Sequence, residues 1–272
     1  MIRTVYVPLD GSELAQAALK PGVALAARAG AELVLLTTRW PGAGVDTPRN
    51  YLDARIAFLD HPARPLLVLD REPEDAIVLA ANEPGAMICM ATHGRGAVRA
   101  AVLGSVAEAV MRESAAPVVL VGGQFSPEWE LVDSPVVIAA LDGSKPSLAA
   151  AHAAGDVAAA ITARVRVVEV LRPSDVITVG ELRDAEVEML EDVVDRLTTL
   201  GVPAGYEVLD GFDAADMLVQ DARDHRAAFL ALASHGRTGL GRVVLGSVAV
   251  KTVRHAPCPV LVVGPAYVGA AF

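Results

Sequence analysis

Cysteines and long apolar runs are both scarce in this 272-residue chain. Its two cysteines are Cys89, within an apolar run, and Cys258, between two prolines. Two cysteines cannot build a disulfide framework and cannot make a zinc site by themselves. No segment approaches the ~18 consecutive apolar residues that a membrane-spanning helix requires. We therefore expect a chain that does not cross a membrane.

Basic residues are also in short supply, since 23 Lys and Arg face 33 Asp and Glu for a net charge of −10. The deficit occurs in both halves of the chain, so neither offers the broad positive surface that binding to a phosphate backbone requires. We expect no nucleic-acid partner. Residues 1–10 lead directly into a strand-like segment and lack the pattern of a signal peptide. A cytoplasmic location is the expectation.

Several motifs that mark enzymes are missing. The chain contains neither the GxxxxGK[ST] phosphate loop nor a strand-linked GxGxxG with its downstream acid. It also lacks the nucleophile elbow GxSxG and the zinc motif HExxH. The sequence therefore gives no positive sign of an enzyme.

An internal repeat is the main feature that is present. Two sequence segments occur twice, LDGS at 9–12 and 141–144 and VLGSVA at 102–107 and 244–249. A third, PVVLVG at 117–122, returns as the similar PVLVVG at 259–264. The offset is 132 residues for the first segment and 142 for the others, so the second unit has ten more residues in its middle. Each unit has the size of a domain. We predict two homologous domains, 1–125 and 133–268.

Short runs that are apolar on both faces, as in strands buried within a parallel sheet, alternate with helical patterns in each unit. We expect the ten residues missing from the first unit to shorten its second helix. The predicted strands are 5–9, 33–37, 66–69, 86–90 and 118–121, then 136–141, 165–170, 206–209, 229–233 and 260–263. The predicted helices are 15–29, 51–59, 75–81 and 106–114, then 148–161, 182–200, 214–224 and 248–255. This alternation predicts an α/β fold with two tandem doubly wound parallel five-stranded sheets, Rossmann-like or flavodoxin-like. Ligands of such sheets bind beyond the carboxyl ends of the strands.

A carboxylate followed by Gly-Ser ends the first strand of each unit, at Asp10 and Asp142. Such a carboxylate can accept a hydrogen bond from a ligand amine or help to position a metal. Alternatively, the Asp and Ser simply cap the following helix. The residues alone leave both interpretations open.

A long loop after the fourth strand runs from Gly94 to Gly104, and from Gly236 to Gly246 in the second unit. Glycines allow close approach of the backbone to a ligand, and a helix N-terminus favours an anion such as phosphate. The alternative is a simple helix cap, because residues 105–108, SVAE, match the capping-box pattern. The loops also carry arginines that could contact phosphate, namely Arg95, Arg99, Arg237 and Arg242.

Both units resemble the universal stress protein family, over nearly the whole chain. The resemblance rests on VPLDGS at 7–12, on ATHG at 91–94 followed nine residues later by GSV, and on the closing PVVLV at 117–121. The second unit repeats it with LDGS, with ASHG at 233–236 before GSV at 246–248, and with APCPVLVV at 256–263. The chain as a whole resembles a tandem member of this family.

The resemblance implies an ATP-binding protein with a stress-response or regulatory role, which holds ATP with Mg²⁺ and hydrolyses it slowly at most. In the nucleotide-binding branch of the family, adenine lies near the Asp and the phosphates lie on the glycine loop. Carried over by position, the implied residues are Asp10, Thr38, Met90, Gly94, Gly104, Ser105 and Val106, then Asp142, Val170, Leu232, Gly236, Gly246, Ser247 and Val248.

One departure keeps a second hypothesis open. The leading glycine of the family pattern is Ala91 in one unit and Ala233 in the other. The alternative is a family member that binds no nucleotide and acts as an interaction module. Family dimers pair through the fifth strand, so we expect 118–121 and 260–263 to pair within one chain, and two chains to be able to form a homodimer.

Overall fold

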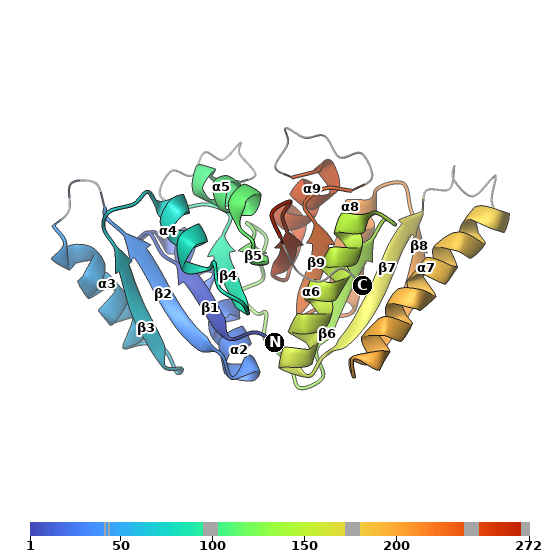
Figure 1. Cartoon of the computed structure of the whole chain (residues 1–272), viewed down its shortest axis with the longest axis horizontal. Coiled ribbons are helices and arrows are strands. Elements are labelled where there is room, and N and C mark those ends of the chain that lie inside the picture. Colours follow the sequence, from blue (N-terminus) through green and yellow to red (C-terminus); the bar gives the residue numbers. More distant parts are fainter. Residues whose placement is uncertain (41, 43, 95–102, 172–179, 237–244, 268–272) are drawn as a thin grey trace.

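The computed structural model describes residues 1–40, 42, 44–94, 103–171, 180–236 and 245–267, without the side chains of 180–186. Two similar lobes lie side by side (Figure 1). Lobe one holds β1 to β5 and lobe two holds β6 to β10. No described helix has the length and apolar character that crossing a membrane requires.

The strands and helices alternate in both lobes. Lobe one contains β1 (Thr4–Pro8), α1 (Glu13–Gln16), α2 (Leu19–Ala29), β2 (Glu32–Thr38), α3 (Asp46–Ile56), β3 (Ala63–Val68), α4 (Pro73–Ala80), β4 (Ala86–Ala91), α5 (Ser105–Glu113) and β5 (Val118–Val121). Lobe two contains β6 (Val136–Leu141), α6 (Lys145–Ile161), β7 (Arg164–Leu171), α7 (Gly180–Thr199), β8 (Ala204–Asp210), α8 (Ala214–Asp224), β9 (Phe229–Ala233), α9 (Ser247–His255) and β10 (Val260–Val263). The predicted α/β class is confirmed.

The described strands form one ten-stranded sheet in the order β3-β2-β1-β4-β5-β10-β9-β6-β7-β8. Each lobe is parallel within itself, and the expected pairing of the two fifth strands is confirmed. β5 and β10 run antiparallel, with Leu120 opposite Val260 and Val118 opposite Val262. All four residues are buried. The two predicted five-stranded sheets are therefore joined at their apolar edges, which would otherwise be exposed to association.

Two glycines let each lobe pack on the last helix of the other. Gly122 follows β5, and a Cβ added there would collide with the Val253 carbonyl in α9. Gly264 follows β10, and a Cβ there would collide with the Met111 carbonyl in α5. The contact is reciprocal, so the junction reproduces within one chain the symmetry of a two-fold dimer.

The segment between the lobes is anchored and partly buried. Trp129 is 7% exposed, and its indole N–H donates to the Ala228 carbonyl at 3.0 Å. Its ring packs against Phe125 and Phe229 at 5.8 and 6.0 Å between centroids. Lys20 of α2 donates to the Pro127 carbonyl at 2.8 Å. The segment therefore contacts both lobes.

Two local predictions were wrong. The single helix over 15–29 is two, α1 and α2, because Pro21 has no N–H to donate back to residue 17. The strands were expected to be buried on both faces, but β3 and β8 lie at the outer edges of the sheet and are largely half-buried or exposed. The expected shortening of the second helix is confirmed: α3 has 11 residues where α7 has 20.

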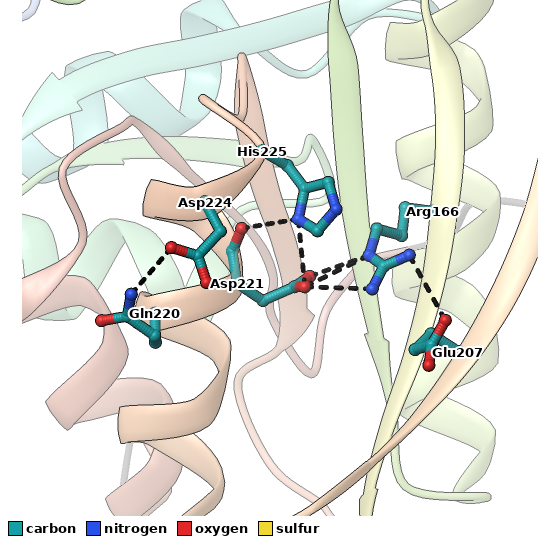
Figure 2. A network of polar contacts seen from close by, with 6 residues as sticks. All are labelled: Arg166, Glu207, Gln220, Asp221, Asp224 and His225. Carbon is teal, nitrogen blue, oxygen red and sulfur yellow. Dashed lines mark hydrogen bonds and ion pairs between the residues drawn. The ribbon is translucent and has the colours of Figure 1, made fainter.

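A network of polar side chains links α8 of lobe two to β7 and β8 (Figure 2). Arg166 of β7 donates from Nε and Nη2 to both carboxylate oxygens of Asp221 in α8, at 3.1–3.2 Å. Asp221 is only 6% exposed. His225, at the end of α8, and Glu207 of β8 complete the group, at 3.1 Å from Asp221 and 3.7 Å from Arg166. The network ties α8 to the outer strands.

Candidate functional site

A cavity of about 300 Å³ lies at the carboxyl ends of β1, β2 and β4 in lobe one. This is where a doubly wound sheet is expected to bind ligands. The structure brings all seven residues implied for lobe one to its walls: Asp10, Thr38, Met90, Gly94, Gly104, Ser105 and Val106.

The sequence left open whether Asp10 faces a ligand or orders the turn before the next helix, and the structure places it where it can do both. Its Oδ1 accepts hydrogen bonds from the Ser12 N–H at 2.9 Å and from the Ser12 hydroxyl at 2.6 Å. Ser12 then caps α1 by accepting from the Ala15 N–H at 3.2 Å. Asp10 therefore orders the turn through Oδ1 and also lines the cavity.

Gly94 is required by the protein itself. A Cβ added at Gly94 would collide with Oδ2 of Asp10, which lies against its backbone. The glycine thus allows the Asp10 carboxylate to reach its position at the cavity wall. A second glycine, Gly104, is less constrained, because a Cβ there would come only to 3.3 Å from the Thr92 carbonyl.

The capping-box prediction for residues 105–108 is wrong. Gly104 is the N-cap residue of α5, in extended conformation at φ −72° and ψ 158°, and Ser105 is the first helical residue. The Gly104 N–H donates to the Thr92 carbonyl at 2.7 Å, which fixes the start of the helix beside β4. The first backbone N–H groups of α5 have no partner within the helix. Together with the Ser105 hydroxyl they offer donors to an anion.

The rest of the cavity wall is mainly apolar and includes residues that the sequence analysis missed. Leu36, Ile77 and Met90 contribute buried side chains. Trp40 closes one side, donates from its indole N–H to Thr37 Oγ1 at 3.0 Å, and packs edge-on against Tyr51 at 5.2 Å. Its place two residues beyond the end of β2 was the signal that could have identified it.

Lobe two repeats the turn and the helix start. Oδ1 of Asp142 accepts from the Ser144 N–H at 3.1 Å and from its hydroxyl at 2.6 Å. A Cβ at Gly236 would collide with Oδ2 of Asp142. The Gly246 N–H donates to the Ser234 carbonyl at 2.7 Å. The other implied residues lie in the matching elements: Val170 in β7, Leu232 in β9, and Ser247 and Val248 in the first turn of α9.

Two polar features distinguish the second lobe. Glu169 of β7 is 3% exposed and occupies the position of Thr37. Lys251 of α9 lies between two carboxylates at the start of α8, with Nζ at 2.8 Å from Asp213 and 2.6 Å from Asp216. The ammonium lowers the pKa of Asp213, and the two carboxylates raise the pKa of Lys251. The residue of lobe one that corresponds to Lys251 is Ala109.

The four loop arginines, Arg95, Arg99, Arg237 and Arg242, lie outside the described residues. Within the described ranges, no group of three or more His, Cys, Asp or Glu side chains is arranged to hold a metal ion.

The model of the universal stress protein family matches residues 1–44, 42–122 and 135–264. The chain belongs to this family. A universal stress protein of Methanocaldococcus jannaschii is 33% identical over 137 residues, which is 47% of this chain and 80% of the relative. The duplicated motifs had pointed to the same family.

Solved structures of tandem length share the fold of the universal stress protein. A putative universal stress protein from Pseudomonas aeruginosa UCBPP-PA14 has a TM-score of 0.67 at 19% identity, over 97% of this chain and 94% of that one. One from Archaeoglobus fulgidus has a TM-score of 0.65 at 20% identity, over 96% and 98%. These likenesses show that the two-lobed architecture recurs.

Proposed function

We propose that this universal stress protein binds ATP in the cavity of lobe one and has a regulatory, stress-response role. The observation that carries the proposal is the convergence of a carboxylate, a helix N-terminus and an apolar wall on one cavity. Its volume of about 300 Å³ is at the lower end of the range for small-molecule sites.

Each part of the cavity matches one part of an adenine nucleotide. The apolar side chains of Ile77 and Met90 suit a planar base, and Asp10 can accept a hydrogen bond from an amine or hydroxyl. The first N–H groups of α5 and the Ser105 hydroxyl can donate to phosphate. Mg²⁺, when bound, would neutralise phosphate charge, and Asp10 and Ser105 are the oxygen ligands that this wall offers.

We propose that the nucleotide acts as a ligand rather than a rapidly consumed substrate. Among the described residues of the cavity wall, the carboxylate and imidazole side chains that could serve as a general acid or base are Asp10 and His93. Oδ1 of Asp10 is held by Ser12, and Nδ1 of His93 lies 3.1 Å from the Thr92 hydroxyl. Both contacts order the turns around the cavity, so we expect ATP hydrolysis well below the usual enzyme range of about 1 s⁻¹ and above.

A matched pair of glycine variants tests the site. Gly104 lines the cavity, whereas a Cβ at Gly123 would meet nothing within 4 Å. ATP with Mg²⁺ at 100 times its dissociation constant should stabilise nucleotide-stripped protein by about 2.7 kcal/mol in thermal unfolding. Gly104→Leu should remove this stabilisation, and Gly123→Leu should keep it. Equal stabilisation of both variants would contradict the proposed site.

The second candidate function is an interaction module without a nucleotide. Ala91 favours it, because this alanine lines the cavity where the family pattern has glycine. That hypothesis expects no ATP-dependent shift in the unfolding of the unmodified chain. Assembly does not separate the two hypotheses: β5 and β10 already pair in the centre of the sheet, so a homodimer of two chains must use another surface.

A further inference from the structure

The floor of the cavity in lobe one is neutral. Thr37 lies at the end of β2 and lines the cavity while being 1% exposed to solvent. Its hydroxyl donates to the Leu9 carbonyl at 2.6 Å and accepts from the Trp40 indole N–H at 3.0 Å. Thr37 therefore links β1 to the aromatic wall without placing a charge in the cavity.

Lobe two holds a carboxyl group at the corresponding point. β1 pairs with β2 as β6 pairs with β7, with both partners shifted by 132 residues. In this register Glu169, opposite Leu141, is the counterpart of Thr37. Its side chain has five non-hydrogen atoms where threonine has three, and it is 3% exposed.

The turn after the first strand and the start of the last helix are alike in the two lobes. Asp142 orders its turn as Asp10 does, and Gly246 donates to the strand before it at 2.7 Å as Gly104 does. The apolar position Met90 becomes Leu232, and both side chains are buried. Glu169 is therefore the described change that most alters the chemistry of the floor.

We infer that this position decides which lobe binds the nucleotide: Thr37 permits it in lobe one, and Glu169 excludes it from lobe two. The inference rests on the proposed ATP site. The side chain of Glu169 has two more non-hydrogen atoms than that of threonine, and in a position almost closed to solvent this added volume takes space that a base would need. Glu169 is thus a specificity-determining residue of the second lobe.

Exchanging the two residues tests the inference. Calorimetric titration of nucleotide-stripped full-length chain with ATP and Mg²⁺ should give about one site per chain, since only one lobe takes ligand. Thr37→Glu should weaken this site by more than about thirtyfold, whereas Thr37→Ser, which keeps the hydroxyl and adds no volume, should stay within about fivefold. Glu169→Thr should create a second site in lobe two.

The variants separate the possible failures. Circular dichroism and thermal melting check folding, and Glu169→Thr removes a buried carboxyl group, so it does not depend on the chain tolerating a new one. Binding of two nucleotides by the unmodified chain would overturn the inference and leave the proposed function intact. Equal losses in Thr37→Glu and Thr37→Ser, or one site only in Glu169→Thr, would also overturn it. No binding by any variant would overturn the proposed function instead.

Discussion

The two lobes differ in their buried side chains even where their strands pair in the same register. In lobe two, Asp221 of α8 and Arg166 of β7 form a largely buried ion pair (Figure 2). The position of Arg166 is taken in lobe one by Val34, and that of Glu207 by Leu66. Glu169 against Thr37 is a second such exchange, at the ligand end of the same strand. The repeat has thus retained its turns while its buried side chains have changed.

This difference shows which residues the fold itself requires. Gly94 and Gly236 each lie against the carboxylate of their own lobe, and in both cases a Cβ would collide with it. Such positions are set by backbone geometry, so both copies keep them. A floor residue such as Thr37 is constrained only by the packing and charge of its neighbours. It can therefore change, and with it the ligand that binds, while the fold stays the same.

The largest effect is expected when the buried pair of lobe two is broken. Asp221→Ala leaves Arg166 with the more distant and exposed Glu207, at 3.7 Å, as an ion-pair partner, and should lower the free energy of unfolding by about 3 kcal/mol. Urea unfolding measures it. The control is Asp133→Ala, since Asp133 is fully exposed beside Arg28 at 3.4 Å and should matter by less than about 0.5 kcal/mol. Similar losses in both variants would contradict the assignment.

The two equivalent glycines give a binding test of the comparison. Gly94→Ala and Gly236→Ala should each push an Asp carboxylate aside, at a comparable cost of about 1–3 kcal/mol in stability. Only Gly94→Ala should weaken ATP binding, by more than about tenfold. Calorimetry measures the affinity, with Gly123→Ala as a control that meets no neighbour. An equal loss of affinity in Gly236→Ala would show that lobe two also binds.

The smallest effect concerns Tyr6 of lobe one, whose counterpart in lobe two is Ile138. Its hydroxyl donates to Glu83 at 2.9 Å, and burial, followed by that hydrogen bond, raises its pKa to about 12. The unfolded tyrosine ionises near pH 10, so its contribution is present below that pH and is lost as pH rises towards 12. Tyr6→Phe should cost about 1 kcal/mol at pH 8.

The cost of Tyr6→Phe should shrink between pH 10 and pH 12, as measured by urea unfolding at several pH values. The other tyrosines are common to both proteins, so their ionisation cancels in the difference. A cost that stays constant or grows with pH would contradict the raised pKa of Tyr6.

Much of the fold follows from the sequence because its signals are local or repeated. Apolar runs located every strand, and the resemblance to a family whose dimers pair through the fifth strand implied that 118–121 pairs with 260–263. The antiparallel direction of that pair comes from the structure. The break between α1 and α2 was missed because the apolar spacing continues across it. The capping box failed because the Gly104 backbone, held by Thr92 in the next strand, sets the helix start one residue earlier than the pattern implied.

The candidate site was only partly predictable. The cavity gathers all seven residues implied for lobe one, since they belong to turns that recur in the family pattern. Thr37 and Trp40 were missed because their roles depend on a hydrogen bond between them and on burial. A shift of 132 residues places Glu169 opposite Thr37 in the sequence, but only the structure shows that both side chains are buried.

The most direct test of unequal lobes is a crystal structure of the full chain grown with ATP and Mg²⁺. The account predicts nucleotide density in lobe one, between Asp10 and the start of α5 at Ser105, and none beside Asp142 and Ser247. Nucleotide at comparable occupancy in lobe two, or an empty cavity in lobe one, would contradict it.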